Sequence, residues 1–505
     1  MKMKSKHIYL FAAGLLVIAA SGCKKFLEQP VLGQYQSDNF FTSDANAVLA
    51  VNAAYAQLTF TDASSNAIWV LGDLASDDAI KGSSDGDQAD FLNIQNFNIN
   101  PSNSAVEAVW KRYYDGVFKC NVVTDGLATA QPGVSEATRN SVLGQAEFLR
   151  AYYYFNLTVA YGDIPLHLKV ETPEELQSPA IPQVQIYAQI EKDCQAAAGV
   201  LPNTWSGADV GRATKGAALA LLAKTYLFEK KWALAASTAA QVEALGVYSL
   251  LPVFADNFRA ATKNNAEAVF SIQHTSGLSP FQGNNLNQWF APRTLNGYGF
   301  YLPTQSLAAN FEKSPGNVDD PRLDYTVGRA GHPYYDSAFD PSWTSTGYVS
   351  KKHTQPLSEI PLSIKGDGNL NYQAIRFAEV LLIESEALNE SGNSAGALVP
   401  LNKVRKRARE SYINDPTLAA TTNGIVPAGL LPDITTTNQA TLRDLIRVER
   451  RSELALEFHR FFDIIRYGAD YATRALKDKP NFSYTTNQFF PIPESERQTN
   501  LKLGK

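Results

Sequence analysis

The sequence has few cysteines and histidines for its 505 residues: three of the first and six of the second. Three cysteines do not make a disulfide framework. No two histidines stand at metal-ligand spacing, and no HExxH segment occurs. These absences argue against a disulfide-stapled fold and a zinc enzyme. Whether Cys120 and Cys194 pair stays open.

An excess of positive charge and long apolar runs are also missing. The formal net charge is −5, and it becomes −8 without residues 1–22, which carry three lysines and no acid. Nucleic-acid-binding domains carry a basic footprint, so this acidic body argues against nucleic acid as a partner. After residue 22, no apolar run reaches the roughly 20 residues that span a bilayer.

No catalytic motif stands out from its surroundings. Residues 82–86 read GSSDG, a serine-hydrolase pattern, but no β-branched strand precedes them and no apolar helix follows. Residues 85–90 offer three carboxylates without the central glycine and distal glutamate of an EF-hand loop, which is typical of a solvated acidic loop. We therefore expect no enzyme activity, metal or cofactor; a structural calcium ion in the loops stays open.

The N-terminus gives the first positive signal. Three lysines within the first six residues precede an apolar run over 8–20, and Ser21-Gly22 then lead to Cys23. The run has the length of a signal-peptide core and is too short to span a membrane. Small residues before a cysteine are typical of a bacterial lipobox. We expect a signal peptide over 1–22, acyl chains on Cys23 and a lipidated tether over 23–40.

Helical periodicity begins just after the tether. Apolar residues at three- and four-residue steps predict a helix from a cap at Thr42 or Ser43 to about Leu58. Two long helices are expected over about 105–128 and 135–161. Residues 60–104, rich in Asp, Ser, Gly and Asn, are expected to be loop.

Two segments match the spacing of tetratricopeptide units, in which small residues let paired helices approach closely. In 214–245 the matching positions are Leu222, Ala223, Tyr226 and Ala235. A later unit keeps the spacing of a second helix after a turn around 392–393, at Ala397, Leu401 and Val404. The two units lie far apart, so separate helical hairpins are predicted rather than a regular solenoid.

Residues 275–372 are rich in Gly, Pro, Asn and Ser and show little helical period. Disordered segments are poor in aromatic residues, whereas this one carries many. They are Trp289, Phe290, Tyr298, Tyr301, Tyr334, Tyr335, Trp343 and Tyr348. Long loops in a compact body are typically functional, so an ordered functional region is expected here.

Several stretches, in order along nearly the whole chain, carry a family resemblance. They are CKKFLEQP (23–30), GQAEFLRAYYYFNLTVAYGDIPL (144–166), AALALLAKTYLFEKKW (217–232), NAEAVFSIQH (265–274), IRFAEVLLIESEALNESGN (375–393), LIRVERRSELALEFHRFFDIIRYG (445–468) and FFPIPESERQTN (489–500). On these stretches the chain resembles the SusD/RagB family of outer-membrane nutrient-binding lipoproteins. One departure is Lys24-Lys25, where acidic residues accompany surface export, although Glu28 partly supplies the acid.

The resemblance implies a mainly α fold. Tetratricopeptide-like helix pairs would form a right-handed superhelical scaffold, packed against a loop-rich ligand-binding half with few short strands. It implies one body over 41–505, with the scaffold at about 41–60, 105–250 and 373–470. The ligand region would lie at about 61–104 and 275–372.

The resemblance also implies a function without catalysis. The protein would bind oligosaccharides or polysaccharide and deliver them to a SusC-like TonB-dependent barrel transporter. Its lipid anchor would hold it on the outer membrane, facing the cell exterior. The alternative is a surface lipoprotein that binds peptides or scaffolds proteins through its helical repeats, without glycan binding.

Ligand contacts are predicted among aromatic and polar residues of the loops. Tyr and Trp rings offer sugars a flat apolar face with a polar tip, and polar side chains then fix orientation. Trp289 is the first candidate, followed by Tyr298 and Trp343, with Trp69 in second line. The polar partners expected beside these rings are Asn287, Gln288, Arg293, Asp77 and Asp78.

The stretch 445–468 is interpreted as scaffold. We expect one helix with a buried stripe formed by Leu454, Phe458, Phe461 and Ile465. Pairs at three- and four-residue spacing, each worth a few tenths of a kcal/mol, are expected among Arg450, Arg451, Glu453 and Glu457.

Overall fold

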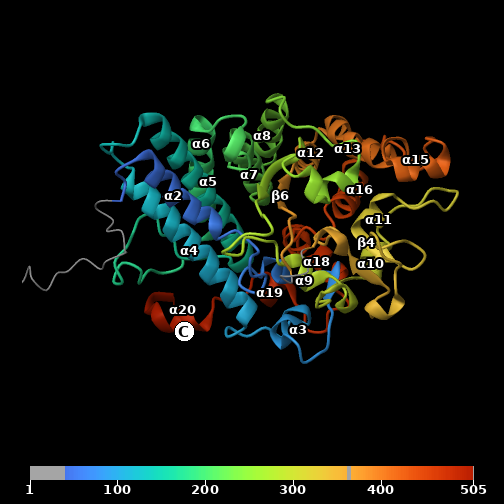
Figure 1. Cartoon of the computed structure of the whole chain (residues 1–505), viewed down its shortest axis with the longest axis horizontal. Helices are drawn as coiled ribbons and strands as arrows, with labels where there is room; N and C mark the ends of the chain where they lie inside the picture. The colour runs from blue at the N-terminus through green and yellow to red at the C-terminus, as the bar shows by residue number, and fades with distance from the viewer. Residues whose placement is uncertain (1–39, 361–365, 504–505) are drawn as a thin grey trace, which may run out of the picture.

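The computed structural model of this protein describes residues 40–360 and 366–503 (Figure 1). The predicted signal peptide, the lipidation site Cys23 and nearly all of the tether lie outside these residues. Within the described residues the chain is mainly helical, with three short two-stranded sheets. None of the helices in these two ranges combines the length and apolar character needed to cross a bilayer.

One side of the molecule is a row of long helices, each packed against the next (Figure 1). The row contains α2 (Asp44–Ala56), α4 (Ser104–Gly126), α5 (Glu136–Tyr161), α6 (Gln183–Val200), α7 (Lys215–Phe228), α8 (Trp232–Ala244), α12 (Phe377–Glu390) and α13 (Ser394–Arg409). Although α8 and α12 are far apart in sequence, they lie side by side.

The predicted limits of α2, α4 and α5 are confirmed to within a turn. The Ser43 hydroxyl caps α2 by accepting a hydrogen bond from the Asn46 amide at 3.2 Å. Ser135 caps α5 in the same way, and Gly162, with φ of 76°, ends it. Such caps satisfy backbone groups that a helix end leaves without partners.

Both predicted hairpins are confirmed as helix pairs: α7 packs on α8, and α12 packs on α13. Ala223 and Ala235 are fully buried in the first pair, and Ala397 and Leu401 in the second. Cys120 in α4 and Cys194 in α6 are free thiols in the core, and burial raises the pKa of both.

The other side contains more short elements than the sequence predicts. They are α3 (Ala89–Gln95), α9 (Leu286–Phe290), α10 (Gln305–Ala308), α11 (Arg322–Thr326), β1 (Ala79–Lys81), β3 (Tyr301–Pro303), β4 (Val327–Arg329) and β5 (Tyr348–Ser350). The expectation that 60–104 is loop throughout is therefore wrong. Elements of three to seven residues are too short to show a period in sequence.

The sheets are antiparallel and join segments far apart in the chain. β1 pairs with β3, with Ile80 opposite Leu302, and β4 pairs with β5. β2 (Ala268–Ile272) pairs with β6 (Tyr372–Arg376). One continuous apolar core runs beneath both sides of the described molecule.

The single helix expected over 445–468 is wrong. α16 (Gln439–Glu453) ends before Leu454, and α17 (Arg460–Arg466) starts after His459. Between them Leu456 and Phe458 take positive φ angles of 62° and 68°. The chain turns here because Asp73 accepts the Phe458 amide at 3.0 Å and the Arg460 amide at 3.4 Å.

The local ion pairs expected on that helix are also wrong, because its charges have distant, buried partners. Glu453 contacts Arg322 at 3.0 Å, Arg376 at 3.0 Å, and Arg407. Arg376 also contacts Glu267 at 2.6 Å and Glu457 at 2.7 Å. We call these residues, Glu267, Arg322, Arg376, Arg407, Glu453 and Glu457, the buried charge network.

The remaining helices complete the C-terminal part of the fold. They are α14 (Ser411–Asn414), α15 (Pro416–Thr422), α18 (Ala469–Ala475), α19 (Tyr484–Asn487) and α20 (Glu494–Thr499). Figure 1 shows α20 beneath α4, while α18 lies among the short elements of the loop-rich side. The C-terminal segment therefore reaches both sides of the molecule.

Candidate ligand-binding site

Trp289, the first predicted ligand contact, lies inside an aromatic cluster. It is 7% exposed, and its ring contacts those of Trp69, Phe91, Tyr298 and Phe300 at centroid distances of 5.1–6.0 Å. Its indole N–H donates to Asn285 Oδ1 at 2.8 Å. With its polar tip bonded and its faces covered, Trp289 supports a surface rather than forming one.

Tyr298 is the open member of this cluster. It is 41% exposed and meets Trp289 edge to face, with centroids 5.8 Å apart and planes at 89°. Its backbone amide donates to the Gln288 carbonyl at 2.7 Å, which holds the loop against α9. Tyr298 can therefore present a ring face to a ligand without moving.

The predicted polar neighbours are mostly engaged within the protein. Asn287 is buried, and its side-chain oxygen accepts the Gln355 amide at 2.8 Å. The Gln288 side-chain oxygen accepts from Asn285 at 3.1 Å. Arg293 is exposed but pairs with Asp87 at 2.9 Å and donates to Ser83. That bridge fixes the loop before α3 to the segment after α9.

The two other predicted tryptophans differ in exposure. Trp343 is half-buried, with its ring 5.7 Å from both Tyr334 and Phe339, in a small cluster over β3 and β5. Trp69 is fully buried, and its N–H donates to the Ala63 carbonyl at 3.0 Å. In this conformation Trp69 is a core side chain with no surface for a ligand, because Phe91, Phe290 and Tyr301 surround it.

Asp77 and Asp78 form ion pairs with arginine side chains and are not free to contact a ligand. Arg460 forms two hydrogen bonds to Asp77, at 2.7 and 3.0 Å, and Arg451 contacts Asp77 at 3.0 Å and Asp78 at 2.7 Å. Burial opposes ionisation of Asp77, but the two guanidinium charges outweigh it and hold its pKa below the ordinary value. Asp78 is fully buried behind it.

These ion pairs form the wall of a cavity of about 570 Å³, which we call the charged pocket. It lies where β1, α3, α10, α16, α17 and α18 meet. Its lining is Ser76, Asp77, Ile80, Gln95, Asn96, Thr304, Gln305, Ser306, Arg451, Arg460, Tyr471, Arg474, Ala475, Lys477, Asp478 and Lys479. Amides, hydroxyls and cations dominate this lining, so it can hydrogen-bond a polar ligand.

The charged pocket adjoins one of the predicted aromatic surfaces. Ile80 lines the pocket and also packs on the small cluster that contains Trp343. Gln305 lines the pocket and accepts a hydrogen bond from Tyr348 at 2.8 Å. A ligand longer than the pocket could therefore continue along the β1–β3 edge.

Sequence reasoning missed the cationic half of this pocket. Arg451 and Arg460 belong to the stretch interpreted as scaffold, and Arg474 and Lys479 follow it. Only the contact between residues 76–80 and the C-terminal helices brings them together. Nothing local in the sequence signals that contact, so a pattern search could not have found it.

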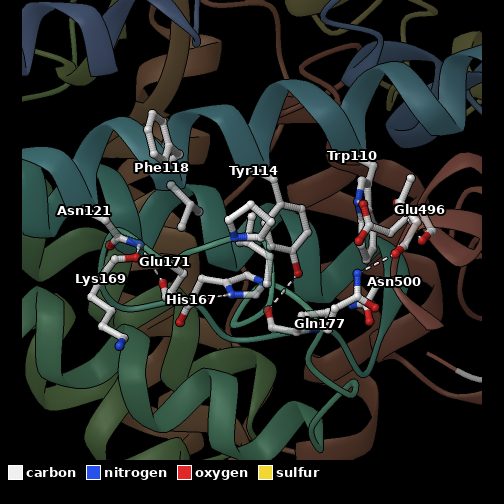
Figure 2. Close-up of a pocket in the computed structure, with 15 residues that line it drawn as sticks. Trp110, Tyr114, Phe118, Asn121, His167, Lys169, Glu171, Gln177, Glu496 and Asn500 are labelled. Carbon is white, nitrogen blue, oxygen red and sulfur yellow. Dashed lines mark hydrogen bonds and ion pairs between the residues drawn. The ribbon is translucent and has the colours of Figure 1, made fainter. Parts of the chain in front are cut away.

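A second cavity, of about 460 Å³, lies on the helical side and is called the α4 pocket (Figure 2). Trp110 and Tyr114 project from α4 toward the segment that carries His167, and Phe118 of the same helix also lines the pocket (Figure 2). Phe118 is 49% exposed and Leu176 is 46% exposed, so the entrance is apolar.

The polar groups of the α4 pocket already have partners. Tyr114 donates to the Pro165 carbonyl at 2.7 Å, and Trp110 donates to Glu496 at 3.3 Å. His167 is paired with Glu171. The pocket therefore offers apolar surface more than hydrogen-bonding groups, which suits a hydroxyl-rich ligand less well than the charged pocket.

No group of His, Cys, Asp or Glu side chains within residues 40–360 and 366–503 is placed to hold a metal ion. Two of the carboxylates at the charged pocket, Asp77 and Asp78, are instead paired with arginine.

Two family models match this chain. One, described as the SusD family, matches residues 266–504, and the other, described as starch-binding associating with outer membrane, matches residues 36–227. Between them they cover most of the helical row and of the loop-rich side.

Individual proteins match across nearly the whole length. SusD-like protein P2 of Formosa agariphila is 27% identical over 528 residues, covering 97% of each chain. A solved structure titled laminarin binding SusD-like protein has a TM-score of 0.76 and 27% identity, covering 92% of this chain and 99% of that one. A SusD-like carbohydrate binding protein from Bacteroides fragilis has a TM-score of 0.77 and 25% identity, covering 92% and 100%.

Proposed function

This chain belongs to the SusD/RagB family of non-catalytic, SusD-like carbohydrate-binding proteins, and from that premise we propose that it binds oligosaccharides at the bacterial outer membrane. The observation that carries the proposal is the charged pocket, an open cavity with a polar lining in the region where the loops meet the C-terminal helices. A relative of the same fold that is titled as laminarin binding supports a glycan as the ligand.

We propose that Tyr298 and Trp343 are the aromatic contacts, because both keep exposed ring surface. Trp289 would act from behind Tyr298 by fixing its position. Asp77 would act through Arg451 and Arg460, which it holds at the pocket wall. Arg293 and Gln288 would shape the loops on which the aromatic residues stand.

The rest of the proposed function concerns the setting of the site. Acyl chains on Cys23 would anchor the protein, with the helical row acting as a tetratricopeptide-like, right-handed scaffold that holds the loop-rich half. The cargo would pass to a SusC-like TonB-dependent transporter. Affinity is expected to be modest, about micromolar to millimolar, because a carrier must release what it captures.

The direct test is calorimetry on residues 24–505, purified without lipid. Laminarin oligosaccharides and a panel of plant, fungal and bacterial glycans would be titrated, with product analysis to exclude cleavage. We expect saturable binding to one glycan class and a loss of affinity in Tyr298→Ala. Absence of binding to every glycan by folded protein would overturn the proposal.

A second candidate function, peptide binding, is favoured by one observation: the exposed apolar entrance of the α4 pocket at Phe118 and Leu176. Phe118→Ala separates the two candidates. Under the glycan proposal this variant binds glycan normally. Under the peptide alternative it loses peptide captured from a random hydrophobic peptide library, while Tyr298→Ala does not.

The proposed partner is tested separately, in cells. Copurification of the lipidated protein with a TonB-dependent barrel after surface cross-linking would support delivery to a transporter. Recovery of the protein alone, together with normal glycan binding, would restrict its role to capture.

A further inference from the structure

We propose that the charged pocket selects saccharides that carry anionic groups, such as the carboxylate of a uronic acid or a sulfate ester. This inference rests on the proposed function and names its substrate class. Five cationic side chains line the pocket against two carboxylates. The cations are Arg451, Arg460, Arg474, Lys477 and Lys479, in a chain whose formal net charge is −5.

The carboxylates of the pocket do not neutralise all of this charge. Asp77 is shared by Arg451 and Arg460, and Asp78 behind the wall pairs with Arg451. Asp478 is exposed at the rim and forms no ion pair among the described residues. Asp77 and Asp78 are thus committed to two guanidinium groups, whereas Arg474, Lys477 and Lys479 form no ion pair among the described residues.

Lys479 is the innermost of these three cations. Its ammonium donates to the Leu74 carbonyl at 3.0 Å, its one hydrogen bond among the described residues. Burial lowers its pKa to about 8, although Asp77 and Asp78 act in the opposite direction. An anionic ligand would supply the direct ion-pair partner that this half-buried ammonium lacks among the described residues.

Arg474 and Lys477 stand at the entrance, one turn apart around the end of α18. Both are exposed, and neither forms an ion pair within residues 40–360 and 366–503. A guanidinium group binds carboxylate or sulfate through two parallel hydrogen bonds, and a lysine adds a mobile point charge. With Lys479 they line the route from solvent to the pocket wall.

The pocket also lacks what recognition of a neutral sugar requires, a free aromatic platform. Its one aromatic residue, Tyr471, has Arg447 and Arg460 over its ring at 5.1 and 5.6 Å. Its hydroxyl accepts from Arg460 at 3.2 Å. Recognition inside the pocket therefore depends on charge and hydrogen bonds, while stacking is left to Tyr298 and Trp343 outside it.

The test compares a neutral hexasaccharide with a sulfated form of the same backbone and with a uronic acid hexamer of a different backbone. Laminarihexaose, chemically sulfated laminarihexaose and hexagalacturonate would be titrated into residues 24–505 at low salt. We expect the two anionic hexasaccharides to bind at least 10-fold more tightly than the neutral one. Their affinity should fall steeply between about 0.05 M and 0.5 M NaCl, because salt screens exposed charges.

Variants assign the effect to the pocket. Lys479→Gln and Arg474→Gln should each weaken binding of the anionic ligands about 10-fold, the effect of one lost charge-assisted hydrogen bond, and leave the neutral ligand unchanged. Arg474 is exposed, so its substitution keeps the test valid if Lys479→Gln unfolds. The matched control is Lys111→Gln, an exposed α4 lysine whose only ion pair among the described residues is with Glu107.

The outcomes separate this inference from the proposed function. Equal or tighter binding of the neutral hexasaccharide, or anionic binding that both variants leave intact, would overturn the charge selection alone. Failure of all three ligands and of the wider glycan panel would overturn glycan binding itself, and this inference with it.

Discussion

At the scale of single residues, Trp289 and Tyr298 belong to one aromatic cluster but differ in how much of each ring is exposed. The two rings meet edge to face, but Trp289 is covered on all sides while Tyr298 is open. A buried tryptophan contributes mainly to stability, whereas an exposed tyrosine ring is free to contact a ligand. Substituting each in turn therefore separates folding from recognition.

Trp289→Ala should lower the free energy of unfolding by about 3–5 kcal/mol, because it leaves a large cavity among Trp69, Phe91 and Phe300. Tyr298→Ala should change it by less than about 1 kcal/mol while weakening glycan affinity. Urea denaturation and calorimetry measure the two effects. A destabilisation of Tyr298→Ala equal to that of Trp289→Ala would assign both rings to the core.

At the scale of elements, the break between α16 and α17 has no counterpart in the apolar pattern of the sequence. The break lets Glu453 end one helix beside Arg322 of α11, Arg376 of β6 and Arg407 of α13. One carboxylate thereby fixes four elements relative to one another. Burial opposes its ionisation, but the three guanidinium charges hold its pKa well below the ordinary range.

Glu453→Gln should destabilise the protein by about 3–5 kcal/mol, because it leaves buried arginines without their counter-charge. The control is Glu174→Gln, an exposed residue with no ion pair among the described residues, which should change stability by less than about 0.5 kcal/mol. Urea unfolding of the three proteins measures the difference. A stability loss in Glu453→Gln no greater than in the control would contradict a structural role for the network.

Substitution of glycine by alanine tests how closely two elements pack, because it adds a Cβ atom at the contact. A Cβ on Gly72 would lie 2.2 Å from the carbonyl oxygen of Phe458, in the break between α16 and α17. Gly72→Ala should therefore cost about 1–3 kcal/mol through forced backbone movement. On α6, a Cβ at Gly199 would meet nothing within 4 Å, so Gly199→Ala should stabilise by about 0.5–1 kcal/mol. Thermal midpoints that move in the same direction would contradict this account.

At the scale of the whole molecule, the sequence predicts the elements of the helical row well and those of the loop-rich side poorly. Long helices can be predicted from apolar residues that recur at three- and four-residue steps and from capping residues such as Ser43 and Gly162. Elements of three residues, such as β1 and β3, gain their order from each other across more than 200 residues, which no local pattern reveals.

The same limit explains the candidate site. Aromatic composition directs attention to the loops around Tyr298, but composition does not distinguish a covered ring from an open one. Trp69 and Trp289 are covered because residues from three separate segments close over them. The cations of the charged pocket come from segments more than 350 residues from Asp77, so their meeting is a property of the fold.

The pH dependence of stability also belongs to the whole molecule. Burial lowers the pKa of His274, His353 and His459 to about 4. In the unfolded chain each takes up a proton near pH 6.5. Between these values the unfolded state binds more protons at these three positions, so the stability that they contribute is lost as pH falls from about 6.5 to about 4.

Each of these histidines should remove about 1.4 kcal/mol of stability per pH unit within that window. Burial raises the pKa of Asp73 and Glu147 to about 7, and these two carboxyls act in the opposite direction over the same pH range, so the histidine contribution is measured as a difference between two proteins. From pH 7.5 to 5, the urea midpoint of the wild type should fall relative to that of His353→Gln, because only the wild type carries the His353 contribution. The His353 ring donates to the Leu456 carbonyl at 2.6 Å, a bond that a glutamine amide can replace. A difference in urea midpoint between the wild type and His353→Gln that stays constant from pH 7.5 to 5 would contradict the prediction.

The buried charge network has a consequence for how this sequence can change over generations. Each of its residues faces two or more partners on other elements, so a single replacement leaves unmatched charge in several places at once. Substitutions at these positions would have to occur together, or the positions would have to stay unchanged. Positions 267, 322, 376, 407, 453 and 457 should therefore vary together among descendants of this chain, while exposed pairs such as Lys111 and Glu107 vary independently.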